Sequence, residues 1–140
     1  MGRLHQLADA LRHHARLRRE RPEIAAGKRG EDIAHRFLQR AGVVIVARNF
    51  RTSNGGSEID LIGWEKDTLV VVEVKSRTSE EFGAPERAMN AEKERAVIRG
   101  AREYARHAEV PFENIRFDVV SVLLVTPPIV RHQRDAFRVI

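Results

Sequence analysis

The feature that most constrains this chain is a pair of apolar runs separated by only three residues. Residues 57–64 (SEIDLIGW) and 68–76 (TLVVVEVKS) are rich in β-branched and apolar side chains, and residues 65–67 join them. Two such runs with a short polar connection predict an antiparallel β-hairpin. Charged side chains nevertheless interrupt both runs, and burying an unpaired charge costs several kcal/mol. The charged residues inside the runs are Glu58, Asp60, Glu73 and Lys75.

The predicted register of the hairpin brings two of these acids together. Side chains alternate across a strand, so Glu58 and Asp60 share one face of their strand, as Glu73 and Lys75 do on the next. With a two- or four-residue turn, Asp60 lies opposite Glu73 and Glu58 lies opposite Lys75, with Cβ atoms about 4.5–5.5 Å apart. An odd turn without a bulge would put Asp60 and Glu73 on opposite faces, and we predict the even register.

Two opposed carboxylates repel each other, and a divalent cation between them would remove that cost. The alternative is an ordinary cross-strand ion network, in which Glu58 pairs with Lys75. A third acid, Glu31, favours the metal interpretation. It lies three residues before Ala34 and seven before Leu38, on the inward face of a predicted helix. A helix N-terminus favours a carboxylate in its first turn, but this does not explain why that carboxylate faces the core.

The rest of the pattern predicts an α/β fold with a mixed β-sheet flanked by helices. The expected order is helix, three strands, helix, strand, with the first three strands as an antiparallel meander. The long second helix is expected to begin near Pro85. The other predicted elements are a helix over 27–42, strands over 43–50 and 115–125, and a short edge strand in the tail 136–140.

Length and composition predict one domain with an appended arm. The 140 residues suit a single core. Residues 1–22 form a predicted basic amphipathic helix that carries +4 of the total charge of +5, which leaves +1 for the domain at 23–140. The chain has no cysteine, so a metal must be held by oxygen or imidazole ligands, which favours Mg²⁺ or Mn²⁺. It also lacks an apolar run of about 18 residues, and we expect a cytoplasmic protein without a membrane span.

Several short motifs resemble one family along most of the chain. They are GKRGEDIAHRFL, ARNFR, SEIDLI, VVVEVKSR, FGAPERAM and RFDVV. Together they are similar to the YraN-like family of small bacterial proteins, over residues 27 to about 137. That family is classed with the PD-(D/E)xK restriction-endonuclease-like and Holliday-junction-resolvase-like folds. Two positions depart from the usual pattern: Ile59 stands where the motif often has proline, and Ser57 where the family often has glycine.

The resemblance implies a metal-dependent nuclease. It assigns Asp60 and Glu73 as metal ligands, with the Val74 carbonyl as a backbone ligand. Lys75 would be the catalytic lysine, and Glu31 would complete the site from the helix. The implied partner is nucleic acid, DNA in preference to RNA. A homodimer stays open, because nothing in the sequence marks an interface.

Four basic residues are candidate phosphate contacts. Arg48, Arg51 and Arg77 stand at strand ends near the predicted site, and arginine does much of the positioning of proteins on nucleic acid. Lys93 lies on the inward face of the long helix, where it either reaches a phosphate or covers apolar surface with its stem. The six histidines show no metal-ligand spacing and are expected at the surface. Asp118 interrupts an apolar strand, and a strand-end ion pair with Arg116 is the simplest account of it.

Two further functions stay open beside the nuclease. The first is a nucleic-acid-binding module that keeps a nuclease fold without turnover, and it predicts salt-dependent binding without cleavage. The second is an interaction protein whose charged hairpin is only an ion network, and it predicts no Mg²⁺ binding.

Overall fold

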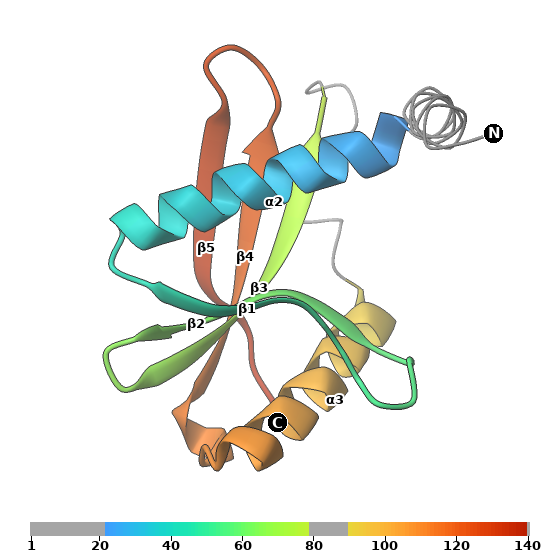
Figure 1. Ribbon diagram of the computed structural model, residues 1–140, viewed down its shortest axis with the longest axis vertical. Coiled ribbons are helices and arrows are strands. Elements are labelled where there is room, and N and C mark those ends of the chain that lie inside the picture. The colour runs from blue at the N-terminus through green and yellow to red at the C-terminus, as the bar shows by residue number, and fades with distance from the viewer. Residues whose placement is uncertain (1–21, 79–89, 140) are drawn as a thin grey trace, which may run out of the picture.

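The computed structural model describes residues 22–78 and 90–139, which form one five-stranded sheet with a long helix on each side (Figure 1). The predicted arm at 1–22 lies, apart from Pro22, outside the described residues. The elements in chain order are α2 (Pro22–Arg40), β1 (Val44–Arg51), β2 (Glu58–Glu65), β3 (Thr68–Arg77), α3 (Ala91–Ala108), a 3₁₀ turn η3 (Phe112–Asn114), β4 (Ile115–Leu123) and β5 (Ile129–Phe137).

The strands lie side by side in the order of the chain, β1-β2-β3-β4-β5. β1, β2 and β3 form the predicted antiparallel meander. β3 and β4 are parallel, and α3 forms the crossover between them, as a parallel connection requires. β5 returns antiparallel to β4. The predicted α/β fold with a mixed sheet is therefore confirmed.

The two helices cover opposite faces of the sheet, because alternate strand residues enter two separate core clusters. Val70 and Val72 pack with the α2 residues Ala34 and Leu38. The cluster on the other face joins Leu69 and Val71 to the α3 residues Val97 and Ala101. In Figure 1, α2 accordingly crosses over the upper halves of β3, β4 and β5, whereas α3 lies at the other end of the picture.

Both helices begin elsewhere than the sequence pattern predicts. α2 begins at Pro22, five residues before the predicted start, since proline is well placed in a first turn. α3 begins at Ala91 and not near Pro85. Asn90 is its N-cap: the Asn90 backbone is extended, and its side chain accepts a hydrogen bond from the Lys93 backbone N–H at 2.8 Å.

The last strand is longer than expected. The tail was predicted to add a short edge strand over 136–140, but β5 runs from Ile129 to Phe137 and pairs with β4. Most of its side chains are polar and partly exposed, which hides the strand from an analysis of apolar runs.

The hairpin of β2 and β3 has the predicted even register. The pairs run from Leu61 with Val72 to Glu65 with Thr68, around a two-residue turn. Lys66, the first turn residue, has φ +54°, which suits the tight turns that match strand twist. The ladder ends at Leu61 and Val72, however. The predicted pairing of Asp60 with Glu73 is therefore not part of the ladder, and the predicted pairing of Glu58 with Lys75 is wrong. Glu58 instead pairs with Arg51 of β1, and their side chains form an ion pair at 3.5 Å.

Neither α2 nor α3 is long and apolar enough to cross a membrane, and the same holds for every helix in the described residues.

Candidate functional site

The candidate site lies where β2 leaves β3. Just beyond the last ladder pair, the Asp60 carboxylate replaces the missing ladder contact. Its Oδ2 accepts a hydrogen bond from the backbone N–H of Val74 at 2.8 Å. The Asp60 carboxylate is therefore bound to Val74, the residue that follows Glu73, and its Oδ1 takes no part in this bond. The two acids come close through this side-chain hydrogen bond and not through a strand pair.

Glu73 is the most unusual residue in the core. It is only 2% exposed, and its Oε1 has no hydrogen-bond partner. Its other oxygen, Oε2, lies 3.6 Å from Nζ of Lys93, which is 45% exposed. A buried carboxylate is normally satisfied on both oxygens, since an unsatisfied buried acceptor costs about 1–3 kcal/mol. The described residues leave this buried oxygen without a hydrogen-bond donor.

The two acids disfavour each other's charge. Burial raises the pKa of Glu73, and the negative charge of Asp60 raises it further, against the opposite effects of Lys93 and Lys75. Burial likewise raises the pKa of Asp60, where the Val74 N–H acts in the opposite direction and Glu31 adds to the rise. A cation bound between them would reverse both shifts.

Two lysines, Lys75 and Lys93, place positive charge near the acid pair. Lys75 follows Glu73 by two residues on the same face of β3, and burial together with the nearby Lys93 lowers its pKa, against the effect of the two acids. Lys93 comes from α3, as its place on the inward helix face predicted. Since its ammonium contacts Glu73, the interpretation of Lys93 as a mere cover for apolar surface is incomplete.

Glu31 approaches the site from α2 because the helix packs closely on β3. A Cβ atom on Gly30 would lie 1.7 Å from Oγ and 2.8 Å from Cβ of Ser76, so only glycine fits at this crossing. Sequence reasoning passed over Gly30, although an isolated glycine inside a helical pattern is a signal of close packing. Glu31 itself is 18% exposed and lies 3.5 Å from Arg48.

The three arginines predicted to contact phosphate differ in their surroundings. Arg48 pairs with Asp32 at 2.9 Å as well as with Glu31, so its charge is already compensated. The charge of Arg51 is similarly held by its ion pair with Glu58. Arg77 is partly buried at the end of β3. It lines a hollow of about 290 Å³ between α2 and β3, together with Glu31, Val74 and Ser76.

The oxygen donors suit a hard cation in their chemistry. Asp60, Glu73 and Glu31 offer carboxylate oxygens, which Mg²⁺ and Mn²⁺ prefer. The free Oε1 of Glu73 and the raised pKa values of the acid pair fit such an ion. The fit is limited to this acid pair, because no group of three or more His, Cys, Asp or Glu in the described residues is arranged to hold a metal.

A second set of charged side chains gathers around Asp118 of β4. Asp118 is fully buried, and both its oxygens accept hydrogen bonds from the Arg116 guanidinium, at 2.8 and 2.9 Å. The predicted Arg116 pair is thus confirmed. The prediction that every histidine lies at the surface is wrong for His132, whose side chain is 9% exposed and whose Nε2 lies 2.7 Å from Asp118 Oδ2.

The fold and the site together define the class of protein. A mixed sheet carries a helix on each face, and acids and lysines meet where a β-hairpin opens. This is an α/β protein with the mixed sheet and flanking helices that the restriction-endonuclease-like resemblance implies.

Comparison with known proteins identifies the family. Residues 30–122 match the model of "Uncharacterised protein family UPF0102", and the chain belongs to this family. It is 46% identical over 137 residues to a UPF0102 protein of Solibacter usitatus, which covers 98% of this chain and 99% of that relative. A UPF0102 protein of Rhodococcus opacus is 40% identical over 116 residues, or 81% of this chain and 97% of that relative. This is the family that the sequence motifs resemble.

Proposed function

We propose that this protein is a cytoplasmic, divalent-metal-dependent nuclease that hydrolyses phosphodiester bonds in DNA or RNA. The observation that carries the proposal is the buried acid pair. Glu73 keeps an unpaired oxygen inside the core, next to an aspartate that raises its pKa and to two lysines. A structural ion network would satisfy such an oxygen, whereas a binding site leaves it for a ligand.

Asp60 and Glu73 would hold Mg²⁺ or Mn²⁺. The family resemblance adds Glu31 and the Val74 carbonyl as further ligands, beyond the acid pair to which the observed fit is limited. When bound, the ion lowers the pKa of a water molecule and neutralises charge on the attacked phosphate. Lys75 would orient that water or stabilise the negative charge that develops on the phosphate oxygens. Lys93 would balance the charge of Glu73, its contact at 3.6 Å. In the reaction water forms one P–O bond, and one P–O ester bond breaks.

A second candidate is a nucleic-acid-binding module without turnover. One observation favours it: the described residues hold no group of three acidic or histidine side chains arranged for a metal. This candidate predicts salt-dependent binding of nucleic acid without cleavage.

Two measurements test the proposal. Titration calorimetry with Mg²⁺ and Mn²⁺ comes first, and both ions are expected to bind the wild type but not Asp60→Asn or Glu73→Gln. The second is a cleavage assay on branched, flapped and single-stranded DNA and RNA. Glu58→Gln is the matched control, because Glu58 is an exposed acid two residues from Asp60. The nuclease proposal fails if the wild type is inactive on every substrate, or if Asp60→Asn cleaves as well as Glu58→Gln.

A further inference from the structure

The outer side of α3 carries a row of arginines. Arg95, Arg99, Arg102 and Arg106 follow one another at steps of four, three and four residues, and all are exposed. This spacing places them on one side of a helix, away from the buried residues Val97 and Ala101. None of these arginines belongs to the predicted site. Apart from the contact of Arg102 with Phe112, packing does not explain why arginine stands at these positions.

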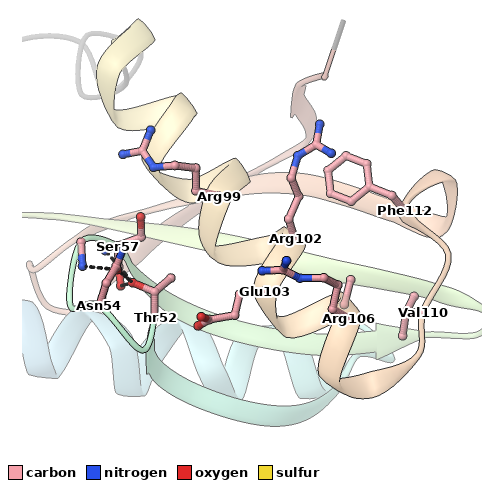
Figure 2. A pocket seen from close by; sticks show the side chains of 11 residues that line it. Thr52, Asn54, Ser57, Arg99, Arg102, Glu103, Arg106, Val110 and Phe112 are labelled. Carbon is pink, nitrogen blue, oxygen red and sulfur yellow. Dashed lines mark hydrogen bonds between the residues drawn. The ribbon is translucent and has the colours of Figure 1, made fainter.

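Three of these arginines line a hollow beside the turn between β1 and β2. The hollow has a volume of about 480 Å³, and Figure 2 shows the arginines spread along α3, with the turn on one side and Phe112 on the other. Residues from the turn that line it are Thr52, Asn54, Gly56 and Ser57. We call Arg99, Arg102, Arg106 and this turn the α3 arginine surface.

The turn is held in one shape by its own hydrogen bonds. The Asn54 side chain accepts from the Thr52 hydroxyl at 2.7 Å and from the Gly56 backbone N–H at 2.9 Å. The Ser57 N–H donates to the Thr52 hydroxyl oxygen at 3.1 Å. The hollow is therefore built before any ligand arrives, which lowers the entropy that binding must cost.

The charge of the α3 arginine surface is largely uncompensated. Within the part of the chain that the structure describes, Arg99 and Arg106 form no ion pair within 4.0 Å, and Arg102 stacks on the Phe112 ring at 4.4 Å. Glu103 is the one acid among the residues that line the hollow, and the positive charge of Arg106 acts on it. Its carboxylate already accepts hydrogen bonds from the backbone N–H and hydroxyl of Ser53. The lining therefore has three positively charged arginines and one glutamate, whose carboxylate is already hydrogen-bonded to Ser53.

The α3 arginine surface lies further along the helix than the candidate site and on the outer side of α3, whereas Lys93 contacts Glu73 from the inward side. Arg99 and Arg106 lie about 9 and 20 Å beyond Lys93 along the helix axis, at about 1.5 Å per residue. A strand that contacts both the surface and the site must therefore pass around α3. Gly100 lies between Arg99 and Arg106, where an added Cβ would be 3.1 Å from Ile59, the neighbour of Asp60. Phosphates follow at about 3.4 Å per strand along the axis of DNA, so this distance corresponds to several nucleotides.

Helix arginines commonly bind phosphates and fix the position of nucleic acid. Two of the three strand-end arginines predicted as phosphate contacts form ion pairs with acids, Arg48 with Asp32 and Arg51 with Glu58. We propose that the α3 arginine surface binds the sugar–phosphate backbone of the nucleic-acid strand whose cleaved phosphate lies at Asp60 and Glu73. This inference rests on the proposed function for the identity of that phosphate.

The test measures binding separately from cleavage. Fluorescence anisotropy with labelled single-stranded and duplex DNA, in EDTA and over a range of salt, compares two double variants. Arg99→Ala with Arg106→Ala removes two charges of the surface. Arg36→Ala with Arg40→Ala removes two exposed charges of α2, the helix on the opposite face of the sheet. Thermal unfolding checks that both variants are folded.

The α3 variant is expected to bind at least about 10-fold more weakly than wild type. Its log–log salt slope should fall by about 1.4 on single strands or 1.8 on duplex, since each lost phosphate contact removes about 0.7 or 0.9. The α2 variant should stay within about 2-fold of wild type. Equal losses in both variants, or no binding by the wild type at low salt, overturn the inference. A selective loss without any cleavage keeps the binding surface and rejects the nuclease proposal alone.

Discussion

Two buried acids on neighbouring strands of this sheet have opposite surroundings. Asp118 of β4 is fully buried and Glu73 of β3 is 2% exposed. Asp118 accepts hydrogen bonds from Arg116, from His132 and from the backbone N–H of Asp135. Glu73 has one oxygen without a partner, a long contact with a partly exposed lysine and a weak backbone hydrogen bond from Asp60. Burial alone therefore does not show whether an acid has its full set of hydrogen bonds.

The pKa values express the same difference. Burial tends to raise the pKa of Asp118, but the hydrogen bonds from His132 and Arg116 outweigh it and lower the pKa to about 2. For Glu73, burial and the charge of Asp60 both raise the pKa, and no equally strong partner opposes them. Hydrogen bonds satisfy both oxygens of Asp118, whereas Glu73 keeps one oxygen without a donor.

The largest expected effect is the loss of the Asp118 network. Asp118→Ala leaves Arg116 and His132 without their buried partner and should lower the free energy of unfolding by about 3–5 kcal/mol. Urea unfolding measures it. Glu73→Gln under the same conditions should not destabilise the protein. Equal destabilisation by both variants would remove the distinction between the two acids.

The stabilisation of the protein by Mg²⁺ should also distinguish the two acidic sites. At 100 times its dissociation constant, Mg²⁺ should raise the free energy of unfolding of the wild type by about 2.7 kcal/mol. Asp60→Asn should abolish this gain, whereas Asp118→Asn should keep it although it begins from a lower stability. Thermal unfolding with and without Mg²⁺ measures both. A gain that survives Asp60→Asn would place the ion elsewhere.

Removal of the strained charge should stabilise the metal-free protein. Glu73→Gln keeps the size of the side chain and deletes a charge that burial and Asp60 both disfavour. We expect its free energy of unfolding in EDTA, at about pH 8, to rise by about 1–2 kcal/mol. Glu58→Gln, at an exposed position, should change it by less than about 0.5 kcal/mol. An equal or lower stability of Glu73→Gln would indicate that the carboxylate is well accommodated.

The pH dependence of stability should have opposite signs for the two acids and fall in different pH ranges. For Glu73 we expect a loss of about 1 kcal/mol between pH 6 and 8. The pKa of Glu73 is raised above its usual value of 4.5, so the folded state retains a proton that the unfolded state releases, and stability falls as pH rises above that value. The lowered pKa of Asp118 gives stability above 3.8 that is lost as pH falls toward about 2. Glu73→Gln should remove only the fall in stability with rising pH. Unfolding curves of the metal-free protein at a series of pH values measure it.

Much of this arrangement could be predicted from local pattern. Alternation along β2 and β3, together with an even turn, is sufficient to determine the register that the structure has. The helical spacing of Glu31 and Lys93 predicted that both face the sheet, and both lie near the acid pair. These are properties of period and parity, which a sequence carries directly.

The remainder depends on tertiary contacts that a period does not encode. β2 pairs with β3 only from Leu61 onward, so the predicted pair of Glu58 with Lys75 was wrong. His132 is buried because the polar strand β5 pairs with β4 next to Asp118. Arg48 is neutralised by acids of α2, which lie far from it in sequence.

The candidate site takes its groups from three layers of the molecule. Glu31 comes from α2, Asp60 and Glu73 come from the sheet, and Lys93 comes from the first turn of α3. Since α2 and α3 pack into separate cores, the sheet and α2 could keep their structure while the start of α3 opens. Such local unfolding would remove Lys93 from Glu73 and leave the acid pair with less positive charge. The rate of hydrogen exchange in the first turn of α3 would then measure how often the folded protein is without a complete site.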